Sequence, residues 1–362
     1  MNNTLTDLYK NKVTLITGHT GFKGSWISLW LTELGAEVVG YSLEPPTKPN
    51  LFESINLEEN ITHIVGDVRD EAHLLKVIQK HQPDFVFHMA AQSIVRRSYE
   101  NPKDTYDTNV MGTIAVLESI RQVENVRACI VVTSDKCYEN KEWIYGYREI
   151  DPLGGYDPYS SSKGCAELVT AAYRRSFFNP EILGKTHNMA LSSVRAGNVI
   201  GGGDWGEDRL LPDCVRALSN GETIPIRAPR SIRPWQYVLE PLEGYLLLGA
   251  RMYADGNKYS DAWNFGPNDS NIVTVEELVS LVIKKWGSGN YATYFSDNLH
   301  EAGLLKLDAS KSRALLGWKP TYSINEAVER TINWYKDFYS GVKGDDLYEL
   351  CVKEIRNFIS LI

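Results

Sequence analysis

The amino-acid sequence predicts an α/β protein with a Rossmann-type, doubly wound parallel sheet and a smaller mixed α/β unit. Three observations lead to this prediction. Short apolar runs alternate with helix-length amphipathic segments in the first half of the chain, as in parallel sheets with crossover helices. A glycine-rich turn joins the first apolar run to the first helix. After Asn198 the alternation gives way to loop-rich segments, such as residues 222–235.

The expected elements of the first half follow one another regularly. Strands are predicted at residues 13–17, 37–41, 62–65, 85–90, 128–134 and 191–196. Helices are predicted from Trp26 to about Gly35 and at residues 71–81, 106–123 and 159–177. Because crossovers between parallel strands are right-handed, this order gives a doubly wound sheet.

The length of the chain indicates more than one structural unit. It has 362 residues, of which 43% are hydrophobic, and this exceeds what one core usually needs. We expect one unit at residues 1–197 plus 235–262, because residues 237–250 have the pattern of a helix packed on the main sheet. A second unit is expected at residues 198–234 plus 263–344. Residues 345–362 are predicted to form a terminal amphipathic helix without a chemical role.

Composition excludes several classes of partner. A net charge of −8 argues against nucleic acid or an anionic membrane as the main partner. No apolar run approaches the roughly 18 residues of a membrane span, and residues 1–7 lack the features of a signal peptide. The five cysteines form no CxxC pair, so neither a metal site nor a disulfide framework is expected. We therefore expect a soluble, cytoplasmic protein.

The loop at residues 17–24 has the composition of a phosphate-binding turn. Glycines in such a turn allow the backbone to approach a pyrophosphate, which then lies at the positive end of the following helix. His19 and Lys23 could add positive charge beside the phosphates or could face solvent. The alternative is a glycine-rich turn that binds nothing. The predicted cofactor contacts in this loop are Gly18, His19, Gly21, Phe22, Lys23 and Gly24.

The adenosine half of the cofactor is less well specified. Asp67, followed by Val68, comes after the third predicted strand and is placed either to bind an adenine edge or to cap a helix. The second strand ends at Tyr41 without the acid that would hold a ribose 2′-hydroxyl or the arginine that would hold a 2′-phosphate. The choice between NAD and NADP therefore stays open, and a loosely held, exchangeable cofactor is one alternative.

The residues that follow the fifth predicted strand carry the chemistry. Tyr159 and Lys163 are four apart on a predicted helix and share a face. A nearby ammonium favours the phenolate, so we expect Lys163 to lower the pKa of Tyr159 and make it a usable base. Ser134, Asp135 and Lys136 end the fifth strand, where parallel sheets bind ligands. A salt-bridged surface pair is the alternative for Asp135 and Lys136.

These motifs resemble the extended short-chain dehydrogenase/reductase family, over nearly the whole chain. The resemblance lies in residues 17–24, 88–91 and 109–113, in Ser134 and in Tyr159-x-x-x-Lys163. Residues 195–198, 233–238 and 316–320 are similar to the nucleotide-sugar enzymes of that family. Residues 18–26 and 195–205 most resemble its 4,6-dehydratases that act on CDP-D-glucose, and the cytidine rests on this resemblance alone. It implies NAD in the first unit and a nucleotide sugar in the second.

The resemblance also implies a reaction, the conversion of CDP-D-glucose to CDP-4-keto-6-deoxy-D-glucose by a hydro-lyase. Tyr159 would take the proton of the sugar 4-hydroxyl, hydrogen-bonded also by Ser134, while hydride leaves C4 for the nicotinamide. Asp135 would protonate the departing 6-hydroxyl, and the hydride would return to C6. Related dTDP-glucose enzymes carry Asp-Glu at this place, with Glu as the C5 base. Here Lys136 would either act as that base in its neutral form, which we favour, or stabilise the C5 enolate.

Further contacts are implied by position. Ala90 and Ala91 would contact the cofactor, Gln92 and Ser93 would lie near the sugar or nicotinamide, and Leu211 would wall the base. Asn198 and Arg233 match positions at which family members bind the substrate phosphates, and an arginine suits phosphate through its planar fork of donors. Arg209, Arg227 and Arg230 could serve instead.

Several alternatives remain at this level. The substrate could be a UDP-N-acetyl, dTDP- or GDP-sugar, and the same fold supports epimerases. A cofactor-sensing regulatory protein is the non-enzymatic alternative, although such proteins commonly lose the Tyr or the Lys. The resemblance implies a homodimer through the helices at 106–123 and 159–177, with a tetramer as the alternative. It also implies a supply of sugars for the O-antigen of bacterial lipopolysaccharide.

Overall fold

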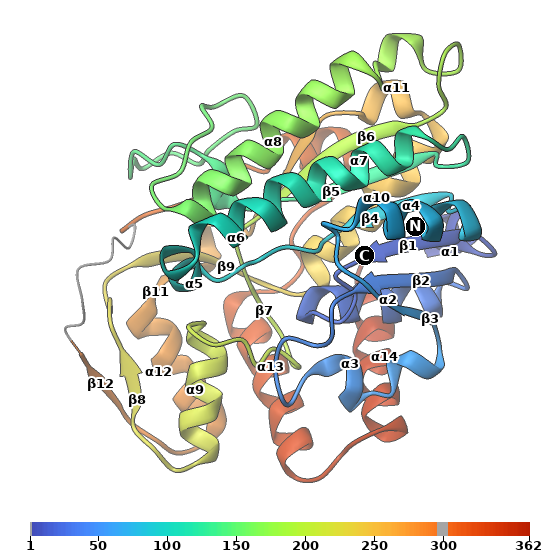
Figure 1. Ribbon diagram of the computed structural model, residues 1–362. Helices are drawn as coiled ribbons and strands as arrows, with labels where there is room; N and C mark the ends of the chain where they lie inside the picture. Colours follow the sequence, from blue (N-terminus) through green and yellow to red (C-terminus); the bar gives the residue numbers. More distant parts are fainter. Residues whose placement is uncertain (1, 295–302) are drawn as a thin grey trace.

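A seven-stranded parallel sheet forms the centre of the protein, which is described by a computed structural model over residues 2–294 and 303–362. The strand order is β10-β6-β5-β4-β1-β2-β3 (Figure 1). This confirms the predicted doubly wound sheet. The strands are β1 Val13–Thr17, β2 Glu37–Ser42, β3 Thr62–Val65, β4 Phe85–His88, β5 Ala128–Val132, β6 Ala190–Ala196 and β10 Ala262–Phe265.

Helices cover both faces of the sheet because successive strand residues point to opposite sides. Along β1, Leu15 packs in the core beneath α4 (Glu71–His81), α7 (Gly112–Arg121) and α8 (Pro158–Ser176). Its neighbour Ile16 packs in the opposite core with α2 (Phe22–Glu33) and α10 (Leu239–Ala254). In Figure 1, α7 and α8 run side by side along one face.

The helix predicted at 106–123 starts earlier and is interrupted. It comprises α6 (Pro102–Tyr106), a π-helical turn at Asp107–Met111, and α7. Asn101 caps its start, and Pro102 occupies the first turn, where proline is tolerated. The π turn turns Asn109 inward, where its amide donates to Gln92 O and Ser162 Oγ. The turn thus ties the loop after β4 to α8.

Two small sheets lie outside the main sheet, in the loop-rich part of the chain from Asn198 onward. β7 (Asn198–Ile200), β9 (Ile232–Tyr237) and β11 (Ile272–Thr274) make one sheet, and β8 (Ile224–Ile226) pairs with β12 (Tyr291–Thr293). The helices of this part are α9 (Leu210–Ser219), α12 (Val275–Trp286) and α13 (Ile324–Tyr339). Residues 295–302 of the expected second unit lie outside the described residues. The main sheet extends past the expected boundary at residue 262, because β10 ends at Phe265.

The end of the chain returns to the first helix of the sheet. α14 (Asp345–Ile359) packs against α2, and Phe358 meets Trp30 edge to face at 5.8 Å between ring centroids. Among the helices of the described chain, none combines the length and hydropathy that a membrane span requires. The shorter elements are α1 (Asn2–Tyr9), α3 (Leu51–Ser54), α5 (Val95–Glu100), α11 (Gly256–Tyr259), 3₁₀ turns at Leu57–Glu59, Asp135–Cys137, Pro180–Ile182 and Asp269–Asn271, and a π turn at Ser312–Leu316.

Candidate active site

The glycine loop lies where the strand order reverses, between β1 and β4. At such a switch point the loops diverge and leave a crevice for a ligand. Gly18 has φ +79°, and a Cβ added there would lie 2.7 Å from Ala90 N. A Cβ on Gly24 would lie 2.0 Å from Gly18 O. Both positions therefore need glycine for steric reasons.

The start of α2 suits an anion. Gly21 is the N-cap residue and makes no side-chain capping bond, so the first N–H groups of the helix lie open to a ligand. Ala90 and Ala91 form the half-buried opposite rim, and Ala90 N donates to Thr17 Oγ1 at 3.2 Å. These features fit the pyrophosphate of the NAD that the family resemblance implies.

The side chain of His19 does not serve the phosphates. It is fully buried against Gly40 and Phe52, and its Nε2 lies 2.7 Å from His63 Nδ1. Burial, followed by the charge of His63, lowers the pKa of His19 to about 3. The expectation that His19 adds positive charge or faces solvent is wrong, because the loop turns its ring under β2. Any cofactor contact would come from its backbone.

Lys23 extends from the first turn of α2 to the catalytic side of the crevice. It is half-buried and lines the large cleft described below. Burial and the charge of Arg209 lower its pKa to about 8, against the opposing charges of Asp135 and Asp204. Lys23 thus faces reacting groups rather than open solvent.

Asp67 does not cap α4. The N-cap is Asp70, whose carboxylate accepts from His73 N at 3.0 Å. Asp67 instead pairs with Arg69 at 2.6 Å, and this lowers the pKa of its carboxyl. Of the two sequence alternatives, the capping role is therefore wrong. Val68, next in the chain, is buried against Gly112, and adenine contacts at both residues stay a prediction.

The residues after β5 and those on α8 meet in one cluster. Ser134 is the N-cap of the turn that carries Asp135 and Lys136, and its hydroxyl donates to Asp135 Oδ1 at 2.9 Å. A hydrogen bond also joins Ser134 to the phenol of Tyr159. The structure therefore brings together a hydroxyl, a carboxyl and a phenol that lie far apart in sequence. Asp157 caps α8 and sets its first turn, on which Tyr159 lies.

The electrostatics of Tyr159 differ from the sequence expectation. The residue is 8% exposed, and burial raises the pKa of the phenol to about 12, while the hydrogen bond to Ser134 and the charge of Arg209 oppose the rise. The expected lowering by Lys163 is wrong for this structure. Lys163 is itself buried, and its Nζ donates to Val132 O at 3.3 Å. Burial and the charge of Lys23 lower the pKa of Lys163 to about 8.

Asp135 sits in the driest part of the cluster. Burial raises the pKa of its carboxyl, although Lys136, the hydrogen bond from Ser134 and the charge of Arg233 favour the ionised form. A raised pKa favours the protonated form of the carboxyl, which is the form that can act as an acid. Lys136 is half-buried beside it. The pair is thus part of the cleft and not a solvated surface salt bridge.

A cleft of about 1170 Å³ runs from this cluster toward α9 and β8. Asn198, Arg233 and the buried Leu211 line it, so the structure brings these predicted substrate residues to the same cavity as Tyr159. Gly197 leaves room for Asp135, because a Cβ on that glycine would lie 3.3 Å from Asp135 Oδ2.

Gln92 and Ser93 separate in the structure. The Gln92 side chain is buried, donates to Ile94 O and Thr105 Oγ1, and does not line the cleft. Its predicted substrate contact is therefore not supported by the described hydrogen bonds. Ser93 does line the cleft and accepts from Arg209 Nη2 at 2.9 Å.

Arg209 is the site residue that sequence reasoning undervalued. It precedes α9 and pairs with Asp204 at 3.0 Å. Its charge helps to lower the pKa of Lys23 and opposes the rise in the pKa of Tyr159. An arginine in a charged loop is usually solvated, so the sequence favoured that interpretation. Its pairing with an acid five residues earlier was the available signal.

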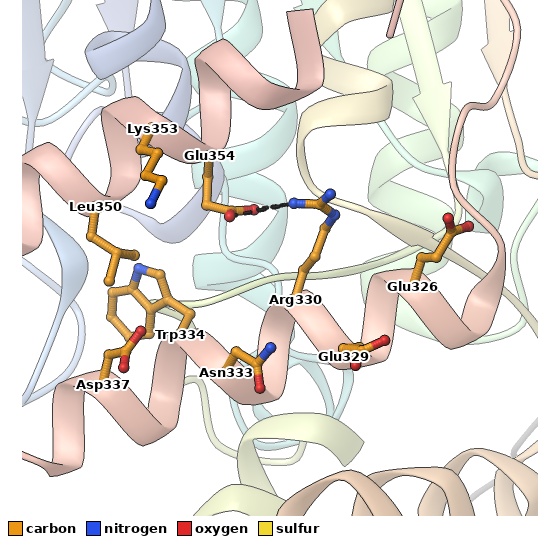
Figure 2. Close-up of a pocket in the computed structure, with 9 residues that line it drawn as sticks. All are labelled: Glu326, Glu329, Arg330, Asn333, Trp334, Asp337, Leu350, Lys353 and Glu354. Carbon is orange, nitrogen blue, oxygen red and sulfur yellow. Dashed lines mark hydrogen bonds and ion pairs between the residues drawn. The ribbon is translucent and has the colours of Figure 1, made fainter. Parts of the chain in front are cut away.

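A second hollow, of about 360 Å³, lies between α13 and α14 (Figure 2). Its wall carries an ion pair of 3.0 Å between Arg330 and Glu354. It contains none of the predicted site residues. The catalytic candidates therefore belong to the larger cleft.

Comparison with known proteins shows the family of this chain. Residues 15–331 match the family model described as GDP-mannose 4,6 dehydratase. The chain belongs to this family. It is 50% identical over 98% of its length, and 98% of the relative's, to the CDP-glucose 4,6-dehydratase of Salmonella typhimurium. This confirms the resemblance to nucleotide-sugar dehydratases of the short-chain dehydrogenase/reductase type.

Solved structures of other proteins share the fold. An epimerase from Methanothermobacter thermautotrophicus matches 93% of this chain and 96% of its own with a TM-score of 0.79 and 24% identity. A dTDP-glucose 4,6-dehydratase from Streptomyces venezuelae with NAD bound matches 91% of this chain and 98% of its own with a TM-score of 0.77 and 23% identity. At these identities both establish the fold alone. They do not decide between dehydration and epimerisation.

Proposed function

We propose that the protein is an NAD-dependent CDP-D-glucose 4,6-dehydratase, which yields CDP-4-keto-6-deoxy-D-glucose. The observation that carries this proposal is the convergence of Ser134, Asp135, Lys136 and Tyr159 in one cleft with Arg233. An oxidation alone needs Tyr159 and a cofactor, whereas loss of water also needs an acid at C6 and a group that acts at C5. The relative that is 50% identical to this chain is a CDP-glucose 4,6-dehydratase, and this supports cytosine as the nucleobase of the substrate.

The residues of the chain divide the work. Tyr159 takes the proton of the sugar 4-hydroxyl. Ser134 stabilises the phenolate that must form first when its hydroxyl turns from Asp135 to the phenolate oxygen. Asp135, whose pKa is raised by burial, gives a proton to the departing 6-hydroxyl. Lys136, beside it, removes the C5 proton as a neutral amine or stabilises the enolate as a cation. The glycine loop and Lys163 would hold NAD, and the bound cofactor would accept hydride from C4 and return it to C6.

The substrate phosphates would lie along the same cleft. Arg233 faces Asp135 closely enough to lower the pKa of that carboxyl, so it can bind a diphosphate beside the reacting sugar. Asn198 and Leu211 line the same cavity. The Arg209 guanidinium, held by Asp204 and Ser93, offers a second cation at the same wall.

One experiment tests the function directly. The protein is incubated with NAD and CDP-D-glucose in deuterated water, and the product is examined by NMR. We expect a 6-deoxy-4-keto sugar with deuterium at C5. An epimer without deuterium at C5 would contradict dehydration, and no turnover with CDP-, dTDP-, GDP- or UDP-sugars would favour a sensor. Faster turnover of one of the other three nucleotides would overturn the cytidine assignment and retain the reaction.

A homodimer is the proposed assembly, with a tetramer as the larger alternative. Met111 lies on the π turn, Leu168 on α8 and Phe177 at the C-cap of α8, and these side chains are 52%, 60% and 46% exposed, respectively. Large apolar side chains exposed on neighbouring helices favour burial against a second copy. The proposed product would enter deoxysugar synthesis for the O-antigen of bacterial lipopolysaccharide.

A further inference from the structure

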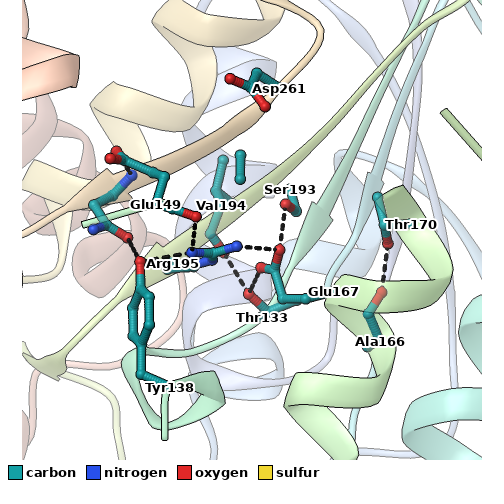
Figure 3. Close-up of polar contacts among 12 residues, drawn as sticks. Thr133, Tyr138, Glu149, Ala166, Glu167, Thr170, Ser193, Val194, Arg195 and Asp261 are labelled. Carbon is teal, nitrogen blue, oxygen red and sulfur yellow. Dashed lines mark hydrogen bonds and ion pairs between the residues drawn. The ribbon is translucent and has the colours of Figure 1, made fainter. Parts of the chain in front are cut away.

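A buried ion pair lies directly behind the catalytic cluster. Glu167 on α8 and Arg195 on β6 meet at 2.7 Å, with side chains only 2% and 3% exposed (Figure 3). The proposed chemistry uses neither residue. A buried charge pair costs desolvation energy, and replacing it with apolar residues is often neutral or stabilising. Its presence here therefore calls for a reason other than stability.

The ion pair is hydrogen-bonded to the chain just before the catalytic turn, which is the turn Asp135–Cys137. Glu167 Oε1 accepts from Thr133 Oγ1 at 2.5 Å, and Thr133 immediately precedes Ser134. Glu167 Oε2 accepts from Ser193 Oγ and from Arg195 Nη2, each at 2.7 Å. The carboxylate thus holds the end of β5 against α8 and β6 at once.

The same ion pair is hydrogen-bonded to the residue that follows this turn. Arg195 Nη1 donates to the hydroxyl of Tyr138 at 2.6 Å, and its guanidinium lies over the Tyr138 ring at 4.8 Å. Tyr138 follows the turn Asp135–Cys137 and donates in turn to Asn264 Oδ1 at 2.8 Å. In Figure 3 the contacts pass without a break from Thr133 through Glu167 and Arg195 to Tyr138.

Glu167 also lies one helical turn after Lys163 on the same face of α8. Its charge raises the pKa of Lys163 and so opposes the lowering by burial and by Lys23. The other ionisable groups that act on Lys163 are His88 on β4 and Cys137 in the catalytic turn. Of these groups, Glu167 is a carboxylate held ionised, because Arg195 and the bonds from Thr133 and Ser193 outweigh burial and lower its pKa.

We propose that the Glu167–Arg195 pair is a positioning unit that clamps the segment Ser134, Asp135 and Lys136 at both ends and fixes it against the helix that carries Tyr159 and Lys163. The residues act through others and touch no substrate. A displacement of about 1 Å in such groups can cost a hundredfold in rate. This inference rests on the proposed function for its kinetic consequences, but the clamp itself is a property of the protein alone.

Three variants test the clamp. Thr133→Val keeps the volume and removes the hydroxyl bonded to Glu167, and Glu167→Gln keeps the shape and removes the charge. The control is Asp261→Asn, which breaks the ion pair of 3.5 Å between Asp261 and Arg174 near the other end of the same helix and also the pair between Asp261 and Lys311. Because Thr133→Val leaves the ion pair intact, it remains informative if Glu167→Gln fails to fold.

Hydrogen exchange measures the clamp without substrate. In Thr133→Val we expect the backbone amides of residues 134–138 to exchange at least about tenfold faster, with no change in the strands β1, β2 and β4. Asp261→Asn should exchange like the wild type at 134–138. Unchanged exchange at 134–138 in Thr133→Val, or an equal increase in Asp261→Asn, would overturn the proposal. If exchange responds as expected while the wild type does not turn over CDP-glucose, the clamp stands and the proposed function fails.

Kinetics separate positioning from a merely structural role. Thr133→Val should lower kcat about tenfold and change KM less than about twofold, because substrate contacts remain. In Glu167→Gln the alkaline limb of the rate profile should move to lower pH, since Lys163 loses the carboxylate that favours its ammonium form. A loss of kcat of the same size at every pH in Glu167→Gln would contradict the effect on Lys163.

Discussion

The two edges of the active-site cleft are built on opposite principles. The cofactor edge, residues 17–24, is defined by backbone, because Gly18 and Gly24 have no room for a Cβ. The catalytic edge, Ser134 to Lys136 with Tyr159, is defined by ionisable side chains in a buried setting. The cofactor edge lacks side-chain atoms so that a ligand can approach the backbone. The catalytic edge supplies the side-chain groups that react.

The difference predicts how each edge fails. Adding a methyl group should damage the cofactor edge, whereas removing a functional atom should damage the catalytic edge and leave the fold intact. The two edges meet through Lys23, which starts on the glycine loop and lowers the pKa of Lys163. Variants at either edge can therefore test whether the division is real.

The largest expected effect comes from a single oxygen of the catalytic edge. Tyr159→Phe removes the group that takes the 4-hydroxyl proton, so kcat should fall about a thousandfold, within the usual range for general acid–base groups. Turnover of CDP-D-glucose and binding of NAD are measured in parallel. NAD affinity should stay within about threefold of the wild type. A variant that retains most of its kcat would place the base elsewhere.

A methyl group should do comparable harm at the cofactor edge. Gly24→Ala places a Cβ 2.0 Å from Gly18 O, so the loop must move and NAD affinity should fall a few hundredfold, as for a severe overpacking. Titration calorimetry with NAD measures this. The matched control is Gly21→Ala, whose Cβ would meet Gly18 O at 3.4 Å and should change affinity less than about threefold. Equal effects of the two variants would contradict a steric origin.

Lys136 distinguishes two kinds of catalytic contribution. Lys136→Ala should slow elimination about a hundredfold, so that reduced cofactor accumulates in a single turnover. Lys136→Arg keeps the charge but cannot act as a base at neutral pH. Recovery of C5 deuterium exchange in Lys136→Arg would assign an electrostatic role, and its continued absence would assign the base. Normal exchange in Lys136→Ala would remove Lys136 from the C5 step.

The buried Lys163 beside the catalytic edge lowers the stability of the folded protein. Its pKa falls from 10.5 to about 8 on folding, so burial of its ammonium destabilises the native state. Lys163→Met should raise the free energy of unfolding at pH 7 by about 3 kcal/mol while activity is lost. The gain should be full below pH about 8 and shrink as pH rises toward 10.5, where both folded and unfolded lysine are neutral. Urea unfolding at pH 7 and pH 10 measures it, and a larger gain at pH 10 would contradict the argument.

The smallest effect is expected outside both edges. Leu168→Arg places a charge on an exposed apolar position of α8, so it should convert the proposed dimer to a monomer. Activity per chain should stay within about twofold, because neither edge contains Leu168. Light scattering after gel filtration measures the mass. A dimer that survives this variant would indicate that another surface joins the subunits.

Much of the fold could be predicted from the sequence because the patterns that indicate its strands and helices are local. The buried apolar run of β1, the short edge strand β3 and the capped helix α4 have the bounds that their sequence patterns predict. The seventh strand, β10, was missed because Ala262–Phe265 is a short run after an irregular stretch. The π turn around Asn109 was also missed, since it depends on hydrogen bonds to Gln92 and Ser162 from other elements.

The sequence by itself determined which chemical groups are present and roughly where the chain turns. Glycine spacing, the Tyr159–Lys163 pair and the strand-end Asp135 and Lys136 are local patterns, and local sterics and helical periodicity are enough to interpret them. Only the tertiary structure decided the pKa shifts of those groups. Burial reverses the expected pKa shift of Tyr159 and neutralises His19, because desolvation depends on every element packed around a side chain.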